Sequence, residues 1–397
     1  MDMETIKEWD GRYVAGTYGR FPLAAEKGAG AWLTAVDGKE YVDFTSGIGV
    51  NALGFCDPDW TAAVARQAAT LNHVSNLYYS VPMVTLAKTL CERTGYDKVF
   101  FANSGAEANE GAIKTARKYS QDKYGEDRYE ILTLVNSFHG RTVTTLAATG
   151  QAAFHEKFMP LTAGFAYAQA GDLEAIKEKV NRHTCAVMLE FIQGEGGVVP
   201  LDRDFVQKTA AYCAEKDLLL IADEVQTGVG RTGTFLASEQ FGIKPDITTL
   251  AKGLGGGLPI GAVLMGEKCA DTLGPGDHGS TFGGNPIAAA GALEVLKKVD
   301  DTLLAETVRK GAYIRRRVQA MPMVKSVTGL GLMIGVEFTG CTGKEAADRA
   351  LGKGAMFLTA KQKLRMLPPL TITDAEIDRG MDILQETLTE LQKEKEK

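Results

Sequence analysis

A chain of 397 residues is long enough to form two or three domains with large buried cores. Its 45% hydrophobic and 24% charged residues are typical of globular proteins, which excludes a mainly disordered or fibrous chain. The formal net charge of −6 comes with no dense basic block, so we expect no nucleic-acid partner.

No stretch approaches 18 uninterrupted apolar residues, and the first residues do not pair a basic segment with an apolar one. We therefore expect a cytoplasmic protein with no membrane partner. The six cysteines stand singly, without the spacing of metal ligands, so we expect reduced thiols and no metal site.

The first predicted element in chain order is a β-hairpin. Two short β-type runs, 31–36 and 40–44, flank the pair Asp37-Gly38, which favours a tight turn. From about residue 80 onward, apolar runs are followed by polar turns and then by helical periodicity. This pattern predicts β-α units of a mostly parallel sheet, with candidate strands at 98–101, 130–135, 185–189, 218–222, 247–250 and 261–265.

Five of these strands end in unusual polar residues. Ligands in open α/β sheets bind outside the carboxyl ends of the strands, so we expect a site where these ends converge. The polar ends are 103–105, 137–139, Glu190, 223–224 and Lys252.

Two helices are predicted beyond the sheet, within a smaller α+β unit. Asn285 and Pro286 suit the N-cap and first position of one helix. Thr373 and Glu376 form a capping-box pattern at the start of the last helix, and apolar residues follow at spacings of three and four.

The first candidate for binding chemistry is Ser104, Gly105 and Ala106, which lie between a strand and a helix. Free backbone N–H groups at such a helix start can hold a phosphate, although an ordinary strand-to-helix turn explains the pattern equally well. The segment fits neither the nucleoside triphosphate motif nor the dinucleotide motif, which disfavours both ligands.

A second candidate is Asp223, which an apolar strand delivers to its polar end. A carboxylate there needs a cationic partner, such as the protonated nitrogen of a pyridine cofactor. Val225 would then pack beneath the ring and Gln226 would bond to a ring oxygen. The alternatives are a helix N-cap and a metal-binding acid, and the lack of a Walker A motif disfavours the metal.

The third candidate, Lys252, follows a strand and precedes a turn dense in glycine. A buried lysine has a lowered pKa, so its neutral amine can bond to an aldehyde and later move a proton. The alternative is a lysine whose charged end reaches solvent, but the nearby glycines favour a bulky planar ligand close to the backbone.

Together these motifs resemble the class III, ω-amino type pyridoxal-phosphate aminotransferases, and the match runs almost the full length of the chain. The matching segments are 103–109, 137–142, 190–198, 223–233, 251–261 and 278–286. The resemblance implies the α/β architecture of fold type I of the pyridoxal-phosphate-dependent transferases. We accordingly predict a large cofactor-binding domain at 51–285 and a small α+β domain formed by 1–50 and 286–397.

The resemblance also implies the roles of residues around pyridoxal 5′-phosphate. Lys252 and Asp223 would be the catalytic residues, with Lys252 carrying the cofactor and Asp223 binding the pyridine nitrogen. Val225 and Gln226 would contact the ring and its phenolic oxygen, and Phe138 would stack on the ring.

The phosphate site implied by the resemblance is shared between two subunits. Ser104, Gly105 and Ala106 match the phosphate-binding turn, and Thr281 matches the residue that reaches the phosphate of the neighbouring subunit. A homodimer with shared active sites follows from that match. His139 is either part of the site or a structural hydrogen-bonding residue.

The implied reaction transfers the terminal amino group of N2-acetylornithine to 2-oxoglutarate, giving a semialdehyde and glutamate in arginine synthesis. Arg141 would hold a substrate carboxylate, while Glu195 and Arg365 match a carboxylate gate whose alternative is an ordinary surface ion pair. Ornithine, succinylornithine, succinyldiaminopimelate and 4-aminobutyrate are alternative amino donors.

Other readings of the sequence lie outside this enzyme class. A non-catalytic small-molecule or nucleotide-binding α/β protein would explain the glycine-rich turns but not Lys252 and Asp223 together. The chain also departs from the family where Phe191 replaces a common proline, so we expect a changed backbone near Glu190.

Overall fold

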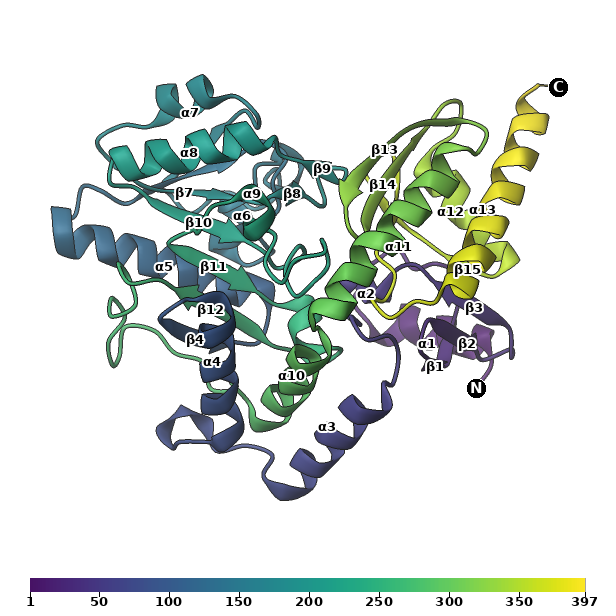
Figure 1. Cartoon of the computed structure of the whole chain (residues 1–397), viewed down its shortest axis with the longest axis horizontal. Coiled ribbons are helices and arrows are strands. Elements are labelled where there is room, and N and C mark those ends of the chain that lie inside the picture. Colours follow the sequence, from purple (N-terminus) through teal and green to yellow (C-terminus); the bar gives the residue numbers. More distant parts are fainter. Residues whose placement is uncertain (397) are drawn as a thin grey trace.

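The computed structural model describes residues 1–396. A seven-stranded sheet lies on one side of the molecule, and two four-stranded sheets lie on the other side together with both chain ends (Figure 1). A two-stranded sheet of β8 (Ile192–Gln193) and β9 (Val199–Pro200) lies next to the junction.

The central sheet confirms the predicted, mostly parallel α/β architecture. Its strands, in spatial order, are β4 (Lys98–Ala102), β12 (Gly261–Met265), β11 (Ile247–Leu250), β10 (Leu219–Asp223), β7 (Thr184–Leu189), β5 (Glu130–Leu134) and β6 (Phe165–Ala168). All run parallel except β12, which is antiparallel to both of its neighbours. The sequence pattern did not predict β6 or the reversed direction of β12.

Helices cover both faces of this sheet, which explains why its inner strands are apolar throughout. Val187 of β7 packs in one cluster with Phe205 of α8 (Arg203–Glu215), and the next residue, Met188, packs in another with Ile113 of α5 (Gly105–Tyr124). The remaining helices on this side are α3 (Pro58–Thr70), α4 (Val81–Thr94), α6 (Val143–Ala148), α7 (Leu173–Lys179), α9 (Ser238–Phe241) and α10 (Pro286–Lys298).

The two four-stranded sheets combine segments from both ends of the chain. One contains β1 (Ala25–Ala29), β2 (Trp32–Ala35), β3 (Glu40–Asp43) and β15 (Ala355–Met356). The other contains β13 (Val324–Leu330), β14 (Met333–Phe338), β17 (Lys363–Met366) and β16 (Leu358–Ala360). The helices beside them are α2 (Ser46–Gly49), α11 (Asp301–Gln319), α12 (Gly343–Lys353) and α13 (Asp374–Lys395).

Local sequence signals determine several of these elements. The predicted hairpin joins β2 to β3, with Gly38 at a φ of 84° in its turn. Asn285 caps α10, and Thr373 with Glu376 forms the capping box of α13, as predicted. The domain boundaries at residues 50 and 285 stay a prediction.

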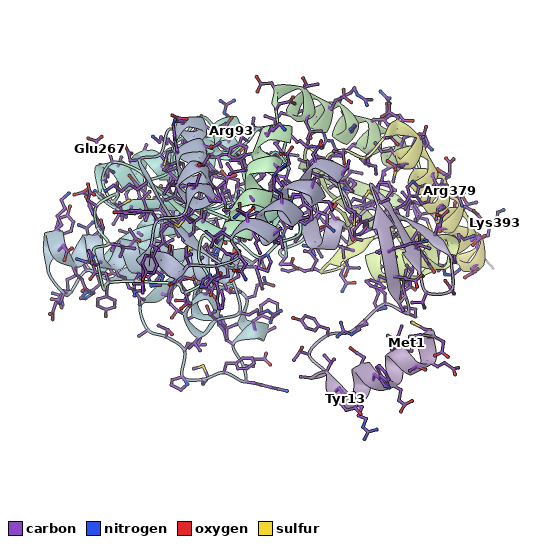
Figure 2. The ribbon with its side chains drawn as sticks, turned by 90° about the horizontal axis from the view of Figure 1, so that it is seen from below. Met1, Tyr13, Arg93, Glu267, Arg379 and Lys393 are labelled. Carbon is purple, nitrogen blue, oxygen red and sulfur yellow. The ribbon has the colours of Figure 1, made fainter. Side chains whose placement is uncertain are left out.

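The pairing of β3 with β15 joins the two ends of the chain. The strands run parallel, with Val42 opposite Ala355, and Lys39 Nζ donates a hydrogen bond to the Gly352 carbonyl, 313 residues away. The first residues behave differently: α1 (Met3–Tyr13) has no buried residue and projects from the body (Figure 2). Within residues 1–396, no helix is both long and apolar enough to cross a bilayer.

Candidate active site

A cavity of about 420 Å³ opens at the carboxyl edge of the central sheet. Residues that follow β4, β5, β7, β10 and β11 line it, as the strand-end argument predicted. Because β12 runs in the opposite direction, residues 257–260 enter the sheet at the same edge and complete the wall. Nine predicted site residues line the cavity: Ser104, Gly105, Ala106, Phe138, Arg141, Asp223, Val225, Gln226 and Lys252.

The start of α5 supplies backbone donors to this cavity. Ser104 is its N-cap, and the Ser104 hydroxyl accepts a hydrogen bond from the Glu107 N–H at 3.2 Å. The N–H groups of Gly105 and Ala106 have no acceptor within the helix, because they belong to its first turn. A Cβ on Gly105 would lie 2.6 Å from Val225 Cγ1, so only glycine fits this close contact. The turn therefore suits an anionic group such as a phosphate.

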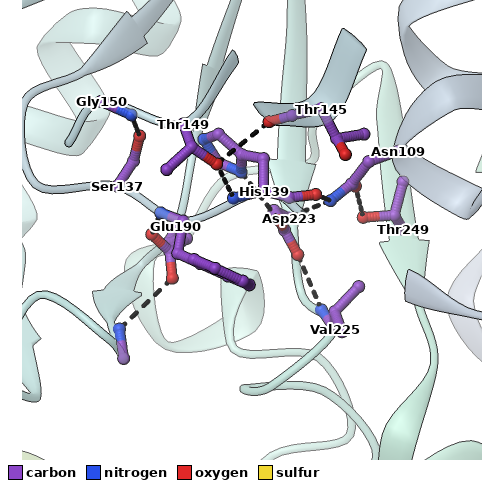
Figure 3. Close-up of polar contacts among 12 residues, drawn as sticks. Asn109, Ser137, His139, Thr145, Thr149, Gly150, Glu190, Asp223, Val225 and Thr249 are labelled. Carbon is purple, nitrogen blue, oxygen red and sulfur yellow. Dashed lines mark hydrogen bonds and ion pairs between the residues drawn. The ribbon is translucent and has the colours of Figure 1, made fainter. Parts of the chain in front are cut away.

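The Asp223 carboxylate is held from several sides (Figure 3). One of its oxygens accepts hydrogen bonds from Asn109 Nδ2 and His139 Nδ1, both at 2.8 Å, and the other accepts from the Val225 N–H at 3.1 Å. Asn109 is fixed in turn by the Thr249 hydroxyl, which donates to Asn109 Oδ1 at 2.7 Å. Within residues 1–396, no Lys or Arg forms an ion pair with Asp223, so this buried carboxylate suits a cationic ring nitrogen.

This network places His139 beside Asp223 and contains a residue that sequence reasoning missed. His139 is buried, lines the cavity and donates from Nδ1 to Asp223. Asn109 was not predicted as a site residue. The available signal was a polar side chain on the buried face of α5, where Ala108 and Ala112 are its apolar neighbours.

Lys252 lies just after β11 in the turn η3 (Lys252–Gly255). Its φ of 41° is a left-handed conformation that costs a residue other than glycine about 1–3 kcal/mol. Burial lowers the pKa of its amine below the usual 10.5, and the Arg365 guanidinium lowers it further, while Glu195 and Asp223 oppose the shift. The lysine is thus biased toward the neutral amine that reacts with aldehydes.

Glu190 is a second functional candidate that was not assigned a role from the sequence. Its carboxylate lines the cavity and accepts hydrogen bonds from the N–H groups of Phe138, at 2.9 Å, and Gly194, at 3.3 Å. Burial and the nearby Asp223 charge raise the pKa of this carboxyl group. The adjacent Phe191 is fully buried and stacks on Phe241, with ring centres 4.8 Å apart.

The two predicted substrate arginines have contrasting environments. Arg141 is exposed at the cavity wall, and its guanidinium carbon lies 5.4 Å from the centre of the Phe138 ring. Arg365 donates from Nη1 to Glu195 Oε1 at 2.6 Å and to Gln226 Oε1 at 3.4 Å. The Arg365 side chain is only 4% exposed, so the alternative of a surface ion pair is wrong.

Three predicted residues do not line the main cavity. Glu195 and Arg365 reach it through Gln226, which lines it and bonds to Arg365. Thr281 is exposed and lines a separate cavity of about 460 Å³, which shares only Asn103 with the first. No group of three or more His, Cys, Asp or Glu side chains within the described chain is arranged to hold a metal ion.

A buried lysine, an anchored carboxylate and a helix start with free N–H groups around one cavity suit an enzyme that uses a phosphorylated pyridine aldehyde. Residues 13–388 match the class-III aminotransferases, and the chain belongs to this family. Its cofactor is pyridoxal 5′-phosphate, as predicted, and the enzyme acts on a small amino donor and a keto acid.

Comparison with known proteins gives relatives that are similar in sequence and in structure. The chain is 54% identical to the acetylornithine aminotransferase of Haemophilus ducreyi, over 98% of this chain and all of the relative. Among solved structures, ornithine aminotransferase from Toxoplasma gondii is similar at 32% identity and a TM-score of 0.94, covering 99% of this chain and 96% of that one. N-acetylornithine aminotransferase from Stenotrophomonas maltophilia is similar at 35% identity and a TM-score of 0.82, covering 96% and 98%.

Proposed function

We propose that this enzyme transfers the terminal amino group of N2-acetylornithine to 2-oxoglutarate, forming N-acetylglutamate 5-semialdehyde and glutamate in arginine biosynthesis. The observation that carries the proposal is that one arginine of the site is paired with a carboxylate and the other is not. Arg141 is open at the cavity wall, whereas Arg365 is neutralised by Glu195. Curated acetylornithine aminotransferases of high sequence identity support the choice of amino donor.

The two arginines suit two substrates of unlike shape. For acetylornithine, Arg141 binds the α-carboxylate far from the reacting terminal amine, and Glu195 keeps Arg365 neutralised beside the reacting carbon. For glutamate, whose α-amine reacts, Arg365 leaves Glu195 to bind the α-carboxylate while Arg141 binds the γ-carboxylate. The contact of Arg365 with Gln226 keeps the guanidinium next to the cavity.

We propose the following roles for the other residues. Pyridoxal phosphate, when bound, accepts the amino group and draws electrons from the substrate carbon. Lys252 would hold its aldehyde until a substrate amine displaces the lysine, and the freed neutral amine would then move a proton from the substrate carbon to the former aldehyde carbon of the cofactor. Asp223 keeps the ring nitrogen protonated, because its carboxylate is fixed by Asn109 and His139.

The remaining contacts bind and orient the cofactor. The N–H groups of Gly105 and Ala106, with the Ser104 side chain, bind the phosphate at the start of α5. Phe138 and Val225 enclose the ring from their places on the cavity wall, and Gln226 bonds to the phenolic oxygen.

We further propose a homodimer in which Thr281 binds the phosphate of the neighbouring subunit. Asn76 Nδ2 donates to the carbonyls of Ser280 and Gly283, both at 2.9 Å, so the turn η1 (Ser75–Leu77) lies beside the segment that contains Thr281. This region exposes 97% of Tyr79 and 60% of Phe282, an apolar surface that a second subunit would cover.

Mixing two inactive variants tests the shared site. Each heterodimer of a Lys252→Ala and a Thr281→Ala subunit has one site that contains both an intact lysine and an intact threonine. Random assortment of the two variants therefore restores about a quarter of the wild-type number of sites. No gain of activity on mixing, with subunit exchange shown by mass spectrometry, would contradict the shared site.

The donor assignment is tested with purified holoenzyme and 2-oxoglutarate. We expect acetylornithine to give the highest kcat/KM in a panel that also contains ornithine, succinylornithine, succinyldiaminopimelate and 4-aminobutyrate. A tenfold higher kcat/KM for any other donor would overturn the assignment and leave the family assignment intact.

A further inference from the structure

A short helical turn places an additional aromatic ring against Phe138 and Arg141, two residues that line the cavity. This turn, η2 (Ala152–Phe154), follows α6 and is anchored by Gln151, whose side chain donates to the Ser137 carbonyl at 3.0 Å. Phe154 is half-buried and meets Phe138 edge to face, with ring centres 5.9 Å apart and an interplanar angle of 76°. Phe154 is therefore fixed relative to the end of β5.

The face of this ring holds the Arg141 guanidinium. Arg141 Cζ lies 4.1 Å from the centre of the Phe154 ring, closer than its 5.4 Å distance from the Phe138 ring. Among residues 1–396, Arg141 has no carboxylate at ion-pair distance and no hydrogen-bond acceptor. The two rings thus provide the contacts that orient its charged group.

We propose that Phe154 is a positioning residue that sets the enzyme's preference for substrates with a carboxylate remote from the reacting amine. The inference rests on the proposed role of Arg141 as the receptor for that carboxylate. A ring stacks on the flat face of a guanidinium and leaves its N–H edge free, and this edge is what a carboxylate binds with two hydrogen bonds.

This arrangement differs from that of Arg365, whose N–H group is already bonded to Glu195. A substrate carboxylate has to displace Glu195 to reach Arg365, but it can bind Arg141 without displacing any protein group. The contact with Phe154 also restricts the flexible Arg141 side chain before substrate arrives, which lowers the entropy lost on binding. Arg141 is therefore available in both half-reactions.

The test compares holoenzymes carrying Phe154→Leu, which removes the ring, and Phe154→Tyr, which keeps it. Glutarate serves as an unreactive dicarboxylate, and its Kd is measured by calorimetry. We expect Phe154→Leu to raise the Kd of glutarate about three- to tenfold, within the range of a cation–π contact. The Kd of Phe154→Tyr should stay within about twofold of the wild-type value. If Phe154→Leu does not fold, Phe154→Met replaces it as the variant without a ring.

Two further measurements separate positioning from a general structural role. In single turnovers, Phe154→Leu should raise the half-saturating concentration of acetylornithine but not of N-acetylputrescine, which has the same terminal amine and no carboxylate. In an Arg141→Ala background, Phe154→Leu should have no additional effect on glutarate binding.

The inference is overturned if Phe154→Leu and Phe154→Tyr weaken glutarate binding equally. It is also overturned if Phe154→Leu still weakens glutarate binding in the Arg141→Ala background. It is also overturned if the wild type and Phe154→Leu bind glutarate equally. Because glutarate binding does not depend on which amino donor is used, failure of the acetylornithine assignment would be seen separately in the donor panel.

Discussion

Replacing Glu195 by glutamine should shift the enzyme toward α-amino acids, because Glu195 competes with an incoming carboxylate for Arg365. The two side chains meet at 2.6 Å between Arg365 Nη1 and Glu195 Oε1. The substitution keeps the size of the side chain and removes its charge. Glutamate, whose α-carboxylate must reach Arg365, then has no anionic competitor.

The size of the effect follows from the burial of the pair. A hydrogen bond to a charged group contributes about 1.5–3 kcal/mol to stability. Arg365 is 4% exposed but Glu195 is 30% exposed, and solvent screening therefore places this pair in the lower part of that range. If the activation free energy for glutamate falls by about 1.5–2 kcal/mol relative to acetylornithine, the ratio of the glutamate rate constant to the acetylornithine rate constant rises about 10- to 30-fold.

Single-turnover absorbance of the holoenzyme measures this ratio, since each donor is mixed alone with the enzyme. Glu130→Gln is a matched control, because Glu130 begins β5 and bonds to Asn181 away from the cavity. We expect the control to keep the wild-type ratio. An unchanged ratio in Glu195→Gln, or an equal loss with both donors, would refute the gate.

Three other predictions concern the cofactor site. Pyridoxal phosphate should attach to the cofactor-free enzyme faster as pH rises, because the Lys252 amine must lose its proton to react. Burial lowers the pKa of Lys252, so the midpoint of this pH dependence should lie below 10.5. A midpoint at or above 10.5 in stopped-flow measurements would contradict this prediction. Asp223→Asn should still bind the cofactor but slow transamination about 100-fold or more, and a near-normal kcat would limit Asp223 to a structural role. Asn109→Ala should lower the free energy of unfolding by about 1–3 kcal/mol, because the buried Thr249 hydroxyl loses its acceptor and Asp223 loses one of its three donors. A change below about 0.5 kcal/mol in urea titrations would contradict the network.

The sheet could be predicted from the sequence because each inner strand is an apolar run that ends in polar residues. The composition of β12 is the same in either direction, so only the length of the connection before it indicates its direction. The connection at 251–260 is too short for the helical crossover that a parallel neighbour needs, and this length forces β12 to run antiparallel to β11. The edge strand β6 was missed because it is short and mostly half-buried.

The position of the site was predictable for the same reason, but the partners of its residues were not. Strand ends located Asp223 and Lys252, whereas the support of Asp223 by Asn109 comes from a helix 114 residues away in sequence. Glu195 and Arg365 are separated by 170 residues, and only the folded chain shows that they form an ion pair in which Arg365 is buried. Phe154 has no motif of its own, and its contact with Arg141 depends on how a loop folds back.

The pairing of β3 with β15 has a consequence for synthesis on the ribosome. The segment around Lys39 leaves the ribosome 313 residues before its partner at Gly352. At about 5–20 residues per second, roughly 15–60 s pass before β15 becomes available to pair with β3. During that interval the edge of β3 is open to other chains, and an unpaired strand edge promotes aggregation. Slow translation of the middle of the chain should therefore reduce the soluble yield more than it affects the stability of the finished enzyme.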